Sequence, residues 1–540
     1  MLECAAKRGA TPPDATRARQ NMGPLMYRQL LALLVLTCAA ATLPAVAKDK
    51  ETPPPATAAK EEGKSAEKPK DGDIQIAPFP ADKTIHETAT LAGRVVKYDA
   101  TVGSLPVMDE KGKTIANVMF TAYTVPGANR PVTFALNGGP GASSVYLNLG
   151  AIGPKRVQFG AEGDSPSDAP IPKDNAGSWL SFTDLVFIDP VGTGYSYALV
   201  PEAEAKKRFF NPKSDVEYLS RIMFDWLVKN ERLTSPKYLV GESYGGFRGP
   251  RITHFLQTRL GVGLSGMVLV SPYLDPGASR NGDLSPLPWM LTLPSIAAAN
   301  LERQGKLTNA AMADIIGYTR TDYVQDLLKG RSDAQAIERI VKRVTELSGL
   351  DPVFVRRSGG RLETQAYLRE VYRAEGKLGS RYDSNVTAWD PYPFAPTQRT
   401  NDPILDGIIA PTTTAMVEFI THTVGWKYTA RYNALSYEVN RMWSSGESED
   451  DDGNEIERGS VQELRQSVAV DPKLNVLIVH GWDDLSCPFM ASVLIVDQMP
   501  IMGNPNRVQV KEYPGGHMFY SRADSQTALR ADVMKMYGAR

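Results

Sequence analysis

Cysteine is scarce in this sequence: only Cys4, Cys38 and Cys487 occur among 540 residues. The first two lie in an N-terminal segment that we expect to be removed, so Cys487 alone would remain. A mature chain with one cysteine has no internal disulfide, although proteins outside the cytosol commonly do. The fold must therefore be held by a hydrophobic core, and the hydrophobic content of 42% is typical of globular proteins.

Neither sign of charge is in excess. Lys and Arg number 60, Asp and Glu number 61, and the formal net charge is −1. This balance gives no electrostatic bias toward nucleic acid or an anionic membrane, so we predict no nucleic-acid partner. The acidic run Glu447–Asp452 has the wrong spacing for a calcium-binding loop and predicts a solvated surface loop. The run therefore predicts no metal site. We also expect no cofactor, and the lone Gly192-Thr-Gly194 lacks the continuation of a nucleotide-binding loop.

Long hydrophobic runs are also missing. The apolar run Leu30–Leu36 follows several arginines, precedes the small-x-small sequence Ala45-Val-Ala47, and is too short for a comfortable membrane span. This pattern predicts a signal peptide over residues 1–47 and export to the periplasm or the medium, with no membrane span after cleavage. Translation could instead begin at Met22 or Met26. Cys38 matches a lipoprotein site poorly.

Composition divides the rest of the chain. Residues 48–75 are rich in Lys, Glu, Pro and Ala, lack apolar periodicity and predict a disordered linker. Residues 76–275 and 436–540 contain strand patterns, whereas 276–435 is dominated by helical patterns. A long helical stretch between strands of one sheet predicts a mostly helical cap insertion within an α/β fold.

Two early segments alternate apolar and polar residues. Residues 88–98 and 116–123 each predict a half-buried strand, and Asp109–Gly112 predicts the turn of a hairpin between them.

A glycine-rich turn follows the buried strand predicted at Tyr238–Val240. Its sequence, Gly241-Glu-Ser-Tyr-Gly245, has the G-x-S-x-G pattern of a nucleophile elbow. A serine on so sharp a turn needs neighbours without a Cβ atom, because the backbone must fold tightly and stay open to substrate. The pattern also arises by chance in a glycine-rich chain and is weak alone. Pro250 predicts a break in the helix that follows.

A second glycine-rich corner follows the strand predicted at Val132–Leu136. Its sequence is Asn137-Gly-Gly-Pro-Gly141. Such a corner can direct backbone N–H groups into a cleft as an oxyanion hole, or it can be an ordinary tight turn.

Acidic residues and a histidine follow two later strands. Asp483 and Asp484 come after the strand at 475–480, and His517 comes after the strand at 508–513. The order of serine, acid and histidine is typical of an α/β-hydrolase. His480 precedes the acids and breaks this order, so a structural role suits it better; His86, His254 and His422 are also less suitable as a base.

Together these motifs resemble the serine carboxypeptidase family, peptidase family S10, and more particularly a bacterial-type member. The resemblance runs from about residue 86 to the C-terminus and rests on four motifs in order: Asn137–Ser144, Gly241–Gly246, Asp484–Cys487 and Gly516–Met518. It implies an α/β-hydrolase fold with a helical cap, and hydrolysis of the C-terminal residue of peptide substrates.

The resemblance also implies roles for residues. Ser243 corresponds to the nucleophile, His517 to the base, and Asp484 to the acid, because the family's acid lies three residues before the cysteine. The oxyanion donors correspond to the backbone N–H groups of Gly139 and Tyr244. The substrate-binding residues implied by these motifs are Asn137, Gly138 and Glu242.

Two positions depart from the family pattern. Ala142 stands where many members carry a cysteine. Ala151 stands where many carry a second glutamate that receives the substrate's terminal carboxylate. The second departure weakens the expectation of strict C-terminal specificity. An esterase, an acyltransferase or another peptidase with the same triad is therefore an alternative, and a non-catalytic binding protein on this fold is a more remote one.

Overall fold

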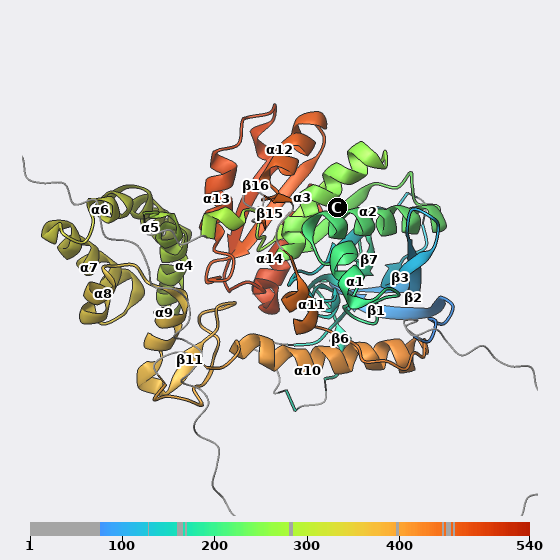
Figure 1. The fold of residues 1–540 in the computed structure, drawn as a ribbon, viewed down its shortest axis with the longest axis horizontal. Helices are drawn as coiled ribbons and strands as arrows, with labels where there is room; N and C mark the ends of the chain where they lie inside the picture. The colour runs from blue at the N-terminus through green and yellow to red at the C-terminus, as the bar shows by residue number, and fades with distance from the viewer. Residues whose placement is uncertain are drawn as a thin grey trace, which may run out of the picture. The chain divides into compact units, whose positions relative to one another are not determined.

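The central element is a ten-stranded mixed sheet. The computed structural model describes residues 76–539 except 128, 159–165, 168–169, 280–283, 396–398, 445–447, 450–454 and 457–458. The predicted signal peptide and linker, and most of the acidic run Glu447–Asp452, lie outside the described residues. The strand order is β1-β2-β3-β7-β4-β9-β10-β15-β16, with β8 beside β3 (Figure 1).

The sheet has an antiparallel part and a parallel part. The strands β1, β2, β3, β7 and β8 are joined by antiparallel pairings, and from β7 through β4 to β16 every pairing is parallel. Their bounds are β1 Lys83–Leu91, β2 Arg94–Met108, β3 Thr114–Thr124, β4 Val132–Leu136, β7 Asp184–Ile188, β8 Tyr197–Ala198, β9 Lys237–Glu242, β10 Gly266–Val270, β15 Asn475–Gly481 and β16 Val508–Tyr513. Three two-stranded ribbons pair β5 Lys155–Arg156 with β6 Lys173–Asp174, β11 Lys377–Gly379 with β12 Thr387–Trp389, and β13 Ser448–Glu449 with β14 Glu455–Ile456.

Helices follow the strands in the parallel part and fill the middle of the chain. Their bounds are α1 Glu202–Phe209, α2 Pro212–Lys229, α3 Tyr244–Arg259, α4 Leu287–Arg303, α5 Asn309–Tyr318, α6 Val324–Lys329, α7 Ala334–Ser348, α8 Pro352–Ser358, α9 Thr364–Glu370, α10 Pro403–Glu418, α11 Tyr437–Met442, α12 Val461–Val470, α13 Phe489–Asp497 and α14 Ala523–Met536.

Both faces of the parallel strands other than the edge strand β16 are buried. Along β15, Val476 and Ile478 belong to one core cluster, which includes residues of α2, α3 and α12, while Leu477 and Val479 belong to the other, which includes residues of α10 and α14. Successive side chains of a strand point to opposite faces, so a strand covered on both sides must be apolar throughout. This explains the continuous hydrophobic runs in the sequence. The mixed sheet with helices on both faces confirms the predicted α/β-hydrolase fold.

The strand predicted at residues 88–98 is wrong, because it is two strands. β1 ends at Leu91 and β2 begins at Arg94, and the two pair in an antiparallel register. The turn consists of Ala92 and Gly93, both with positive φ (46° and 79°). Alternation continues across so short a turn, so periodicity alone could not locate it. The turn predicted at Asp109–Gly112 is present: the Asp109 and Gly112 N–H groups donate to Lys113 and Asp109 carbonyls.

The helix break predicted at Pro250 is also wrong. α3 runs through Pro250 from Tyr244 to Arg259. Proline removes one helical hydrogen bond and crowds the carbonyl four residues earlier. Here every residue from Tyr244 to Thr253 is buried, and that packing outweighs the local cost of one proline.

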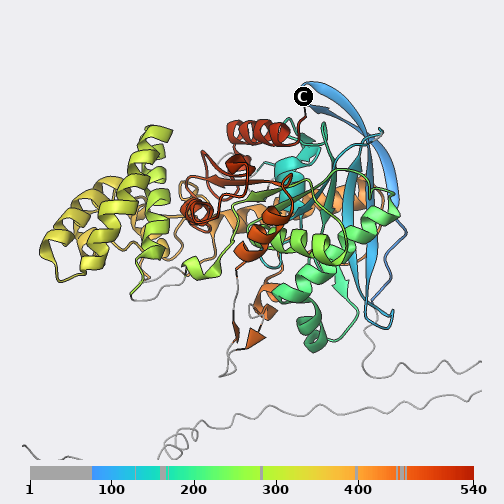
Figure 2. The same cartoon turned by 90° about the horizontal axis from the view of Figure 1, so that it is seen from above.

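The helices α4 to α9 have a hydrophobic core of their own. Buried side chains of α4, α5 and α7 cluster there, among them Ile296, Ile315 and Ile340, and Trp482 and Leu485 from the loop after β15 join them. In Figures 1 and 2 these olive and yellow helices lie together, and α4 contacts α13, the helix between them and the strands β15 and β16 in Figure 1. The limits 276 and 435 of the predicted insertion remain a prediction.

One described helix, Pro403–Thr423, is long and apolar enough by length and composition to cross a membrane. It comprises α10 and the turn after it. Ile404, Ile408 and Met416 on this helix belong to the core cluster on the sheet. The apolar face is thus used in packing, as in the core helix of a folded domain.

Candidate active site

The carboxyl ends of adjacent parallel strands bring the predicted site residues to one edge of the sheet. β4 ends before Asn137, and β9 ends with Glu242 before Ser243. β15 and β16 end before Asp484 and His517. In open α/β sheets, ligands bind at this end of the strands.

Ser243 occupies the turn between β9 and α3. Its φ and ψ are 59° and −119°, a backbone conformation that residues other than glycine rarely adopt. A Cβ atom on Gly241 would lie 2.1 Å from the Gly245 carbonyl oxygen, and one on Gly245 would lie 2.2 Å from the Leu136 oxygen. Both glycines are therefore required sterically. The Ser243 side chain is half-buried, whereas its neighbours on β9 and α3 are buried.

The glycine corner after β4 packs directly on this turn. A Cβ atom on Gly138 would lie 2.5 Å from the Tyr244 nitrogen and 2.9 Å from the Ser243 Cβ. Gly139 has φ 102°, and its N–H donates no hydrogen bond to any residue that the structure describes. The corner is thus placed where the Gly139 N–H could bind an oxyanion beside Ser243.

His517 and Asp484 form a buried pair. The His517 Nδ1 donates to the Asp484 Oδ2 at 2.8 Å, and the exposed fractions of the two side chains are 3% and 0%. The other Asp484 oxygen, Oδ1, accepts from the N–H groups of Ser486 and Cys487 at 2.8 and 2.9 Å. These bonds fix the carboxylate, which in turn fixes the imidazole orientation. The described residues include no hydrogen bond between the Ser243 hydroxyl and His517, and such bonds often tighten only when substrate is bound.

The pKa of His517 lies well above its ordinary value. Burial lowers the pKa of this imidazole, but the adjacent Asp484 charge and hydrogen bond, with a smaller contribution from Cys487, raise it by more. A carboxylate that stabilises an imidazolium is the electrostatic arrangement needed when a histidine accepts a proton during a reaction.

Asp483 faces away from His517 into a different cluster. Its Oδ2 accepts from the Asn385 side chain at 3.2 Å and lies 3.8 Å from the Arg522 guanidinium. Burial and the neighbouring carboxyl group of Glu302 hold the pKa of Asp483 well above its ordinary value. Geometry therefore favours Asp484 over Asp483 as the partner of His517.

The other histidines lie elsewhere. His480 is fully buried, its Nε2 is 2.8 Å from the Ser492 hydroxyl, and burial lowers its pKa to about 4. His86 and His422 are exposed and pair with Asp99 and Glu418. His254 lies within α3. None of these four is bonded to Asp484 in the described structure.

Glu242 is buried beside the predicted nucleophile. Its Oε2 accepts from the Tyr520 hydroxyl at 2.6 Å, and Asn137 also contributes a hydrogen bond. Desolvation by burial raises the pKa of Glu242 to about 7, against the smaller lowering effects of His517, Tyr520 and Asn137. Asn137 is 2% exposed, and its Oδ1 accepts from the Leu147 N–H at 2.9 Å, which leaves its amide as the donor.

Sequence reasoning missed two tyrosines at this site. Tyr520 follows β16 by seven residues and bonds Glu242. Tyr382 lies between β11 and β12, and its ring meets the His517 ring edge-on at 5.2 Å. Tyr520 lies three residues past His517 and could have been suspected from that proximity. Nothing in the sequence around Tyr382 points to the site.

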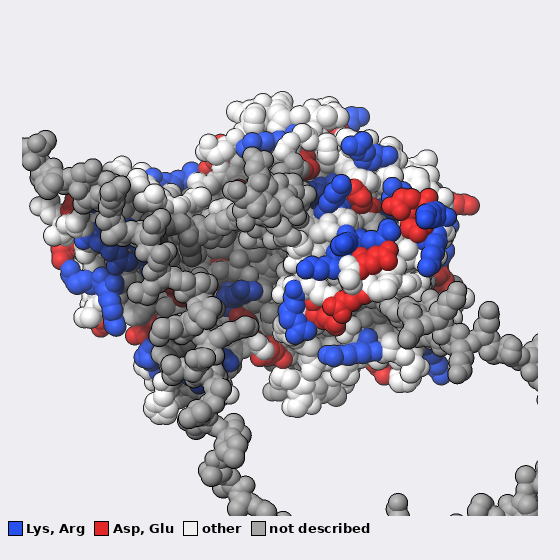
Figure 3. Space-filling view, in the orientation of Figure 1, with Lys and Arg blue, Asp and Glu red and all other residues white. Residues whose placement is uncertain are grey.

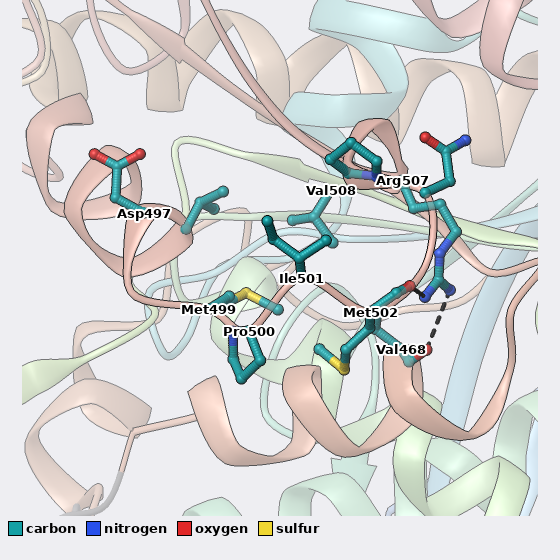
Figure 4. Close-up of a pocket in the computed structure, with 11 residues that line it drawn as sticks. Val468, Asp497, Met499, Pro500, Ile501, Met502, Arg507 and Val508 are labelled. Carbon is teal, nitrogen blue, oxygen red and sulfur yellow. Dashed lines mark hydrogen bonds between the residues drawn. The ribbon is translucent and has the colours of Figure 1, made fainter.

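A cavity of about 250 Å³ lies away from this edge. It is lined by Val468 of α12 and by residues 496–508 around the loop before β16, and Figure 4 shows Ile501 and Met502 among them. It includes none of the predicted site residues. On the face in Figure 3, positive and negative side chains are interspersed, consistent with the balanced composition.

An α/β-hydrolase sheet with a serine at the elbow and a buried acid–histidine pair is the arrangement typical of serine hydrolases. The sequence model of the serine carboxypeptidase family matches residues 94–530, and the chain therefore belongs to this family. The family that the sequence motifs predicted is confirmed.

Individual relatives match over shorter stretches. Serine carboxypeptidase-like 50 from Arabidopsis thaliana is 30% identical over 181 residues, which are 32% of this chain and 38% of that protein. The retinoid-inducible serine carboxypeptidase of Mus musculus is 33% identical over 153 residues, 27% of this chain and 30% of that protein. The chain thus aligns with well under half the length of either of these curated relatives.

A solved structure matches over more of the chain. The crystal structure of a prohormone-processing carboxypeptidase from Saccharomyces cerevisiae has a TM-score of 0.50 and 16% identity, and covers 82% of this chain and 91% of its own. At this identity the likeness supports the fold alone. The relatives named here come from a plant, a mammal and a fungus, and none supports the expectation of a bacterial-type member.

Proposed function

We propose that this protein is a serine carboxypeptidase that removes C-terminal residues from peptides through an acyl-enzyme. The observation that carries the proposal is the buried His517–Asp484 pair at the same sheet edge as the elbow serine. Family membership supports the reaction class.

Each residue has one task in this mechanism. Ser243 attacks the scissile carbonyl while His517 accepts its proton, and Asp484 orients the imidazole and stabilises its charged form. The N–H groups of Gly139 and Tyr244 donate to the oxyanion of the tetrahedral intermediate. His517 then donates the proton to the leaving amine. Water, with His517 again accepting a proton, attacks the acyl-enzyme ester, and the shortened peptide leaves with a new terminal carboxyl group while Ser243 recovers its proton. The reaction requires no cofactor or metal.

Glu242 and Asn137 receive the terminal carboxylate of the substrate, beside the backbone of Gly138. A neutral Glu242 donates a hydrogen bond to that carboxylate, whereas an ionised one repels it. The raised pKa of about 7 keeps a large fraction neutral in mildly acidic solution. Asn137 donates at any pH through its amide. Ala151 has no side chain that can assist, so Glu242 is the acid that makes recognition pH-sensitive.

The experiment that tests this function compares blocked peptides that differ only in a free or an amidated C-terminus. We expect the free acids to be cleaved and the amides to react much more slowly. Equal cleavage of both forms at every pH would make this protein a serine hydrolase of another specificity. Absence of any turnover or labelling by a fluorophosphonate would favour a non-catalytic binding protein.

We further propose export of a mature protein that begins after Ala47, to the periplasm or the medium of a bacterial source. The support is the charged, apolar and small-x-small order of residues 17–47. N-terminal sequencing of the protein recovered from cell fractions tests this, and recovery of an uncleaved cytosolic chain would contradict it.

A further inference from the structure

A short segment between β11 and β12 contacts both loops that carry the predicted acid and histidine. We name residues 380–385 the clamp segment. Its Arg381 carbonyl accepts from the Leu485 N–H at 2.9 Å, next to Asp484. The following carbonyl, that of Tyr382, accepts from the His517 N–H. Two consecutive carbonyls of the clamp segment therefore hold the two loops whose side chains form the His517–Asp484 pair.

Asp383 adds a side-chain contact at the same place. Its Oδ2 accepts from the Gly516 N–H at 3.1 Å and from the Arg522 Nη2 at 2.7 Å. Its Oδ1 accepts from the Asn385 N–H at 3.1 Å. Gly516 and Arg522 lie on either side of His517 in the sequence. One buried carboxylate therefore connects the clamp segment to both ends of the histidine loop.

The histidine loop lies against the clamp segment without a gap. A Cβ atom on Gly516 would lie 1.9 Å from the Tyr382 carbonyl oxygen and 2.4 Å from the Asp383 Cα. Glycine is required here because the two backbones touch. Such contact transmits a displacement of the clamp segment directly to the residue next to His517.

The clamp segment is itself anchored on both sides. The Ser380 hydroxyl and the Arg381 N–H donate to the two Asp402 oxygens at 2.6 and 2.9 Å. Arg522 also pairs with Glu302 of α4, and Trp482 and Leu485 pack in the core of the helices α4 to α9. The acid loop, the histidine loop and the helices are therefore one connected structure.

We propose that Asp383 is a positioning residue for His517, acting through the Gly516 N–H and Arg522, so that the helical part of the molecule helps to set catalytic geometry. The proposal rests on the proposed function. Asp383 does not contact the predicted substrate-binding residues in the described structure, so its effect should fall on kcat rather than on KM.

The test is the variant Asp383→Ala, measured by kcat, KM and the rate of Ser243 labelling by a fluorophosphonate. Small misplacement of a catalytic group can cost about 10²-fold in rate. We expect kcat and the labelling rate to fall about 10- to 100-fold, with KM within about twofold of wild type. Asp383→Asn keeps an oxygen that can accept from Gly516 and should recover much of the loss.

Asp390 provides a matched control. Its side chain is 9% exposed, against 8% for Asp383, and it likewise pairs with an arginine, Arg369. It is not bonded to either catalytic loop in the described structure. Asp390→Ala should lower the melting temperature comparably while kcat and labelling stay near wild type.

Three results would overturn the proposal: wild-type kcat and labelling in Asp383→Ala, an equal loss in Asp390→Ala, or no recovery in Asp383→Asn. If Asp383→Ala does not fold, Asp383→Asn decides. The proposal then requires a measurable loss of kcat at unchanged KM in Asp383→Asn, and wild-type kinetics would refute the role. Failure of the wild-type enzyme to be labelled at all would instead refute the proposed function.

Discussion

The parallel half of the sheet and the helices α4 to α9 contribute to the site in different ways. The sheet positions side chains by register: neighbouring strands end at the same edge, and Ser243, Asp484 and His517 each follow a strand end. The helices contribute through apolar packing against Trp482 and Leu485, and the clamp segment that follows them, between β11 and β12, bonds both loops through its backbone. Strand order thus brings the candidate residues to one edge of the sheet, whereas the clamp segment and the core of the helices contact the two loops that contain Asp484 and His517.

The largest expected loss of activity comes from the parallel half of the sheet, at the serine that follows β9. Ser243→Ala should abolish fluorophosphonate labelling and reduce kcat by up to about 10⁶-fold, as in other serine proteases that lose the nucleophile. Active-site labelling followed by mass spectrometry checks this. Labelling that persists in Ser243→Ala would remove the assignment.

A smaller loss is expected when the orientation of the base is disturbed. Asp484→Asn should reduce kcat by about 10⁴-fold, the magnitude known for a protease triad. Because the Asp484 charge raises the pKa of His517 against the effect of burial, the acidic limb of the pH–rate profile should also move to lower pH. Asp483→Asn should cost far less. The reverse ranking in folded variants would transfer the role to Asp483.

The two regions can also be compared by equal truncations of their cores. Ile478 in β15 and Ile340 in α7 are both fully buried. Each Ile→Ala change should lower the free energy of unfolding by about 2–5 kcal/mol. Ile478→Ala should lower kcat more, because Asp484 lies in the loop that directly follows β15. Denaturant unfolding and kinetics of the two variants check this, and equal kinetic losses would contradict the distinction.

The smallest effect concerns substrate recognition. KM for free-acid peptides should rise as pH increases through about 7, because Glu242 is neutral below its pKa and ionised above it. Glu242→Gln keeps a donor without a charge, so it should flatten this rise and leave amide or ester substrates little affected. The measurement is KM against pH for matched peptides. A rise in KM that persists unchanged in Glu242→Gln would assign the titration to another group.

The sequence alone predicted the fold and the candidate residues wherever the signal was local. Continuous apolar strands and the glycines at 241 and 245 each express a constraint between near neighbours. The order of Ser243, Asp484 and His517 was recognised because each residue lies in a short motif directly after a strand pattern. Close approach of backbones makes glycine necessary at the elbow, and that necessity can be recognised in sequence. The turn at Ala92 was missed because the apolar–polar alternation continues across it. The break predicted at Pro250 was wrong because burial of the helix outweighs the local cost of one proline.

Tertiary structure alone decided the remaining relationships. The family resemblance favoured Asp484 through its spacing to Cys487, but only the structure shows that Asp484 is bonded to His517 and that Asp483 is bonded to Asn385 instead. The hydrogen bond from Tyr520 to Glu242 joins positions 278 residues apart, and the one from the Gly516 N–H to Asp383 joins positions 133 residues apart. Such contacts depend on how separate elements pack, and no periodicity or spacing in a single chain records which distant surfaces will meet.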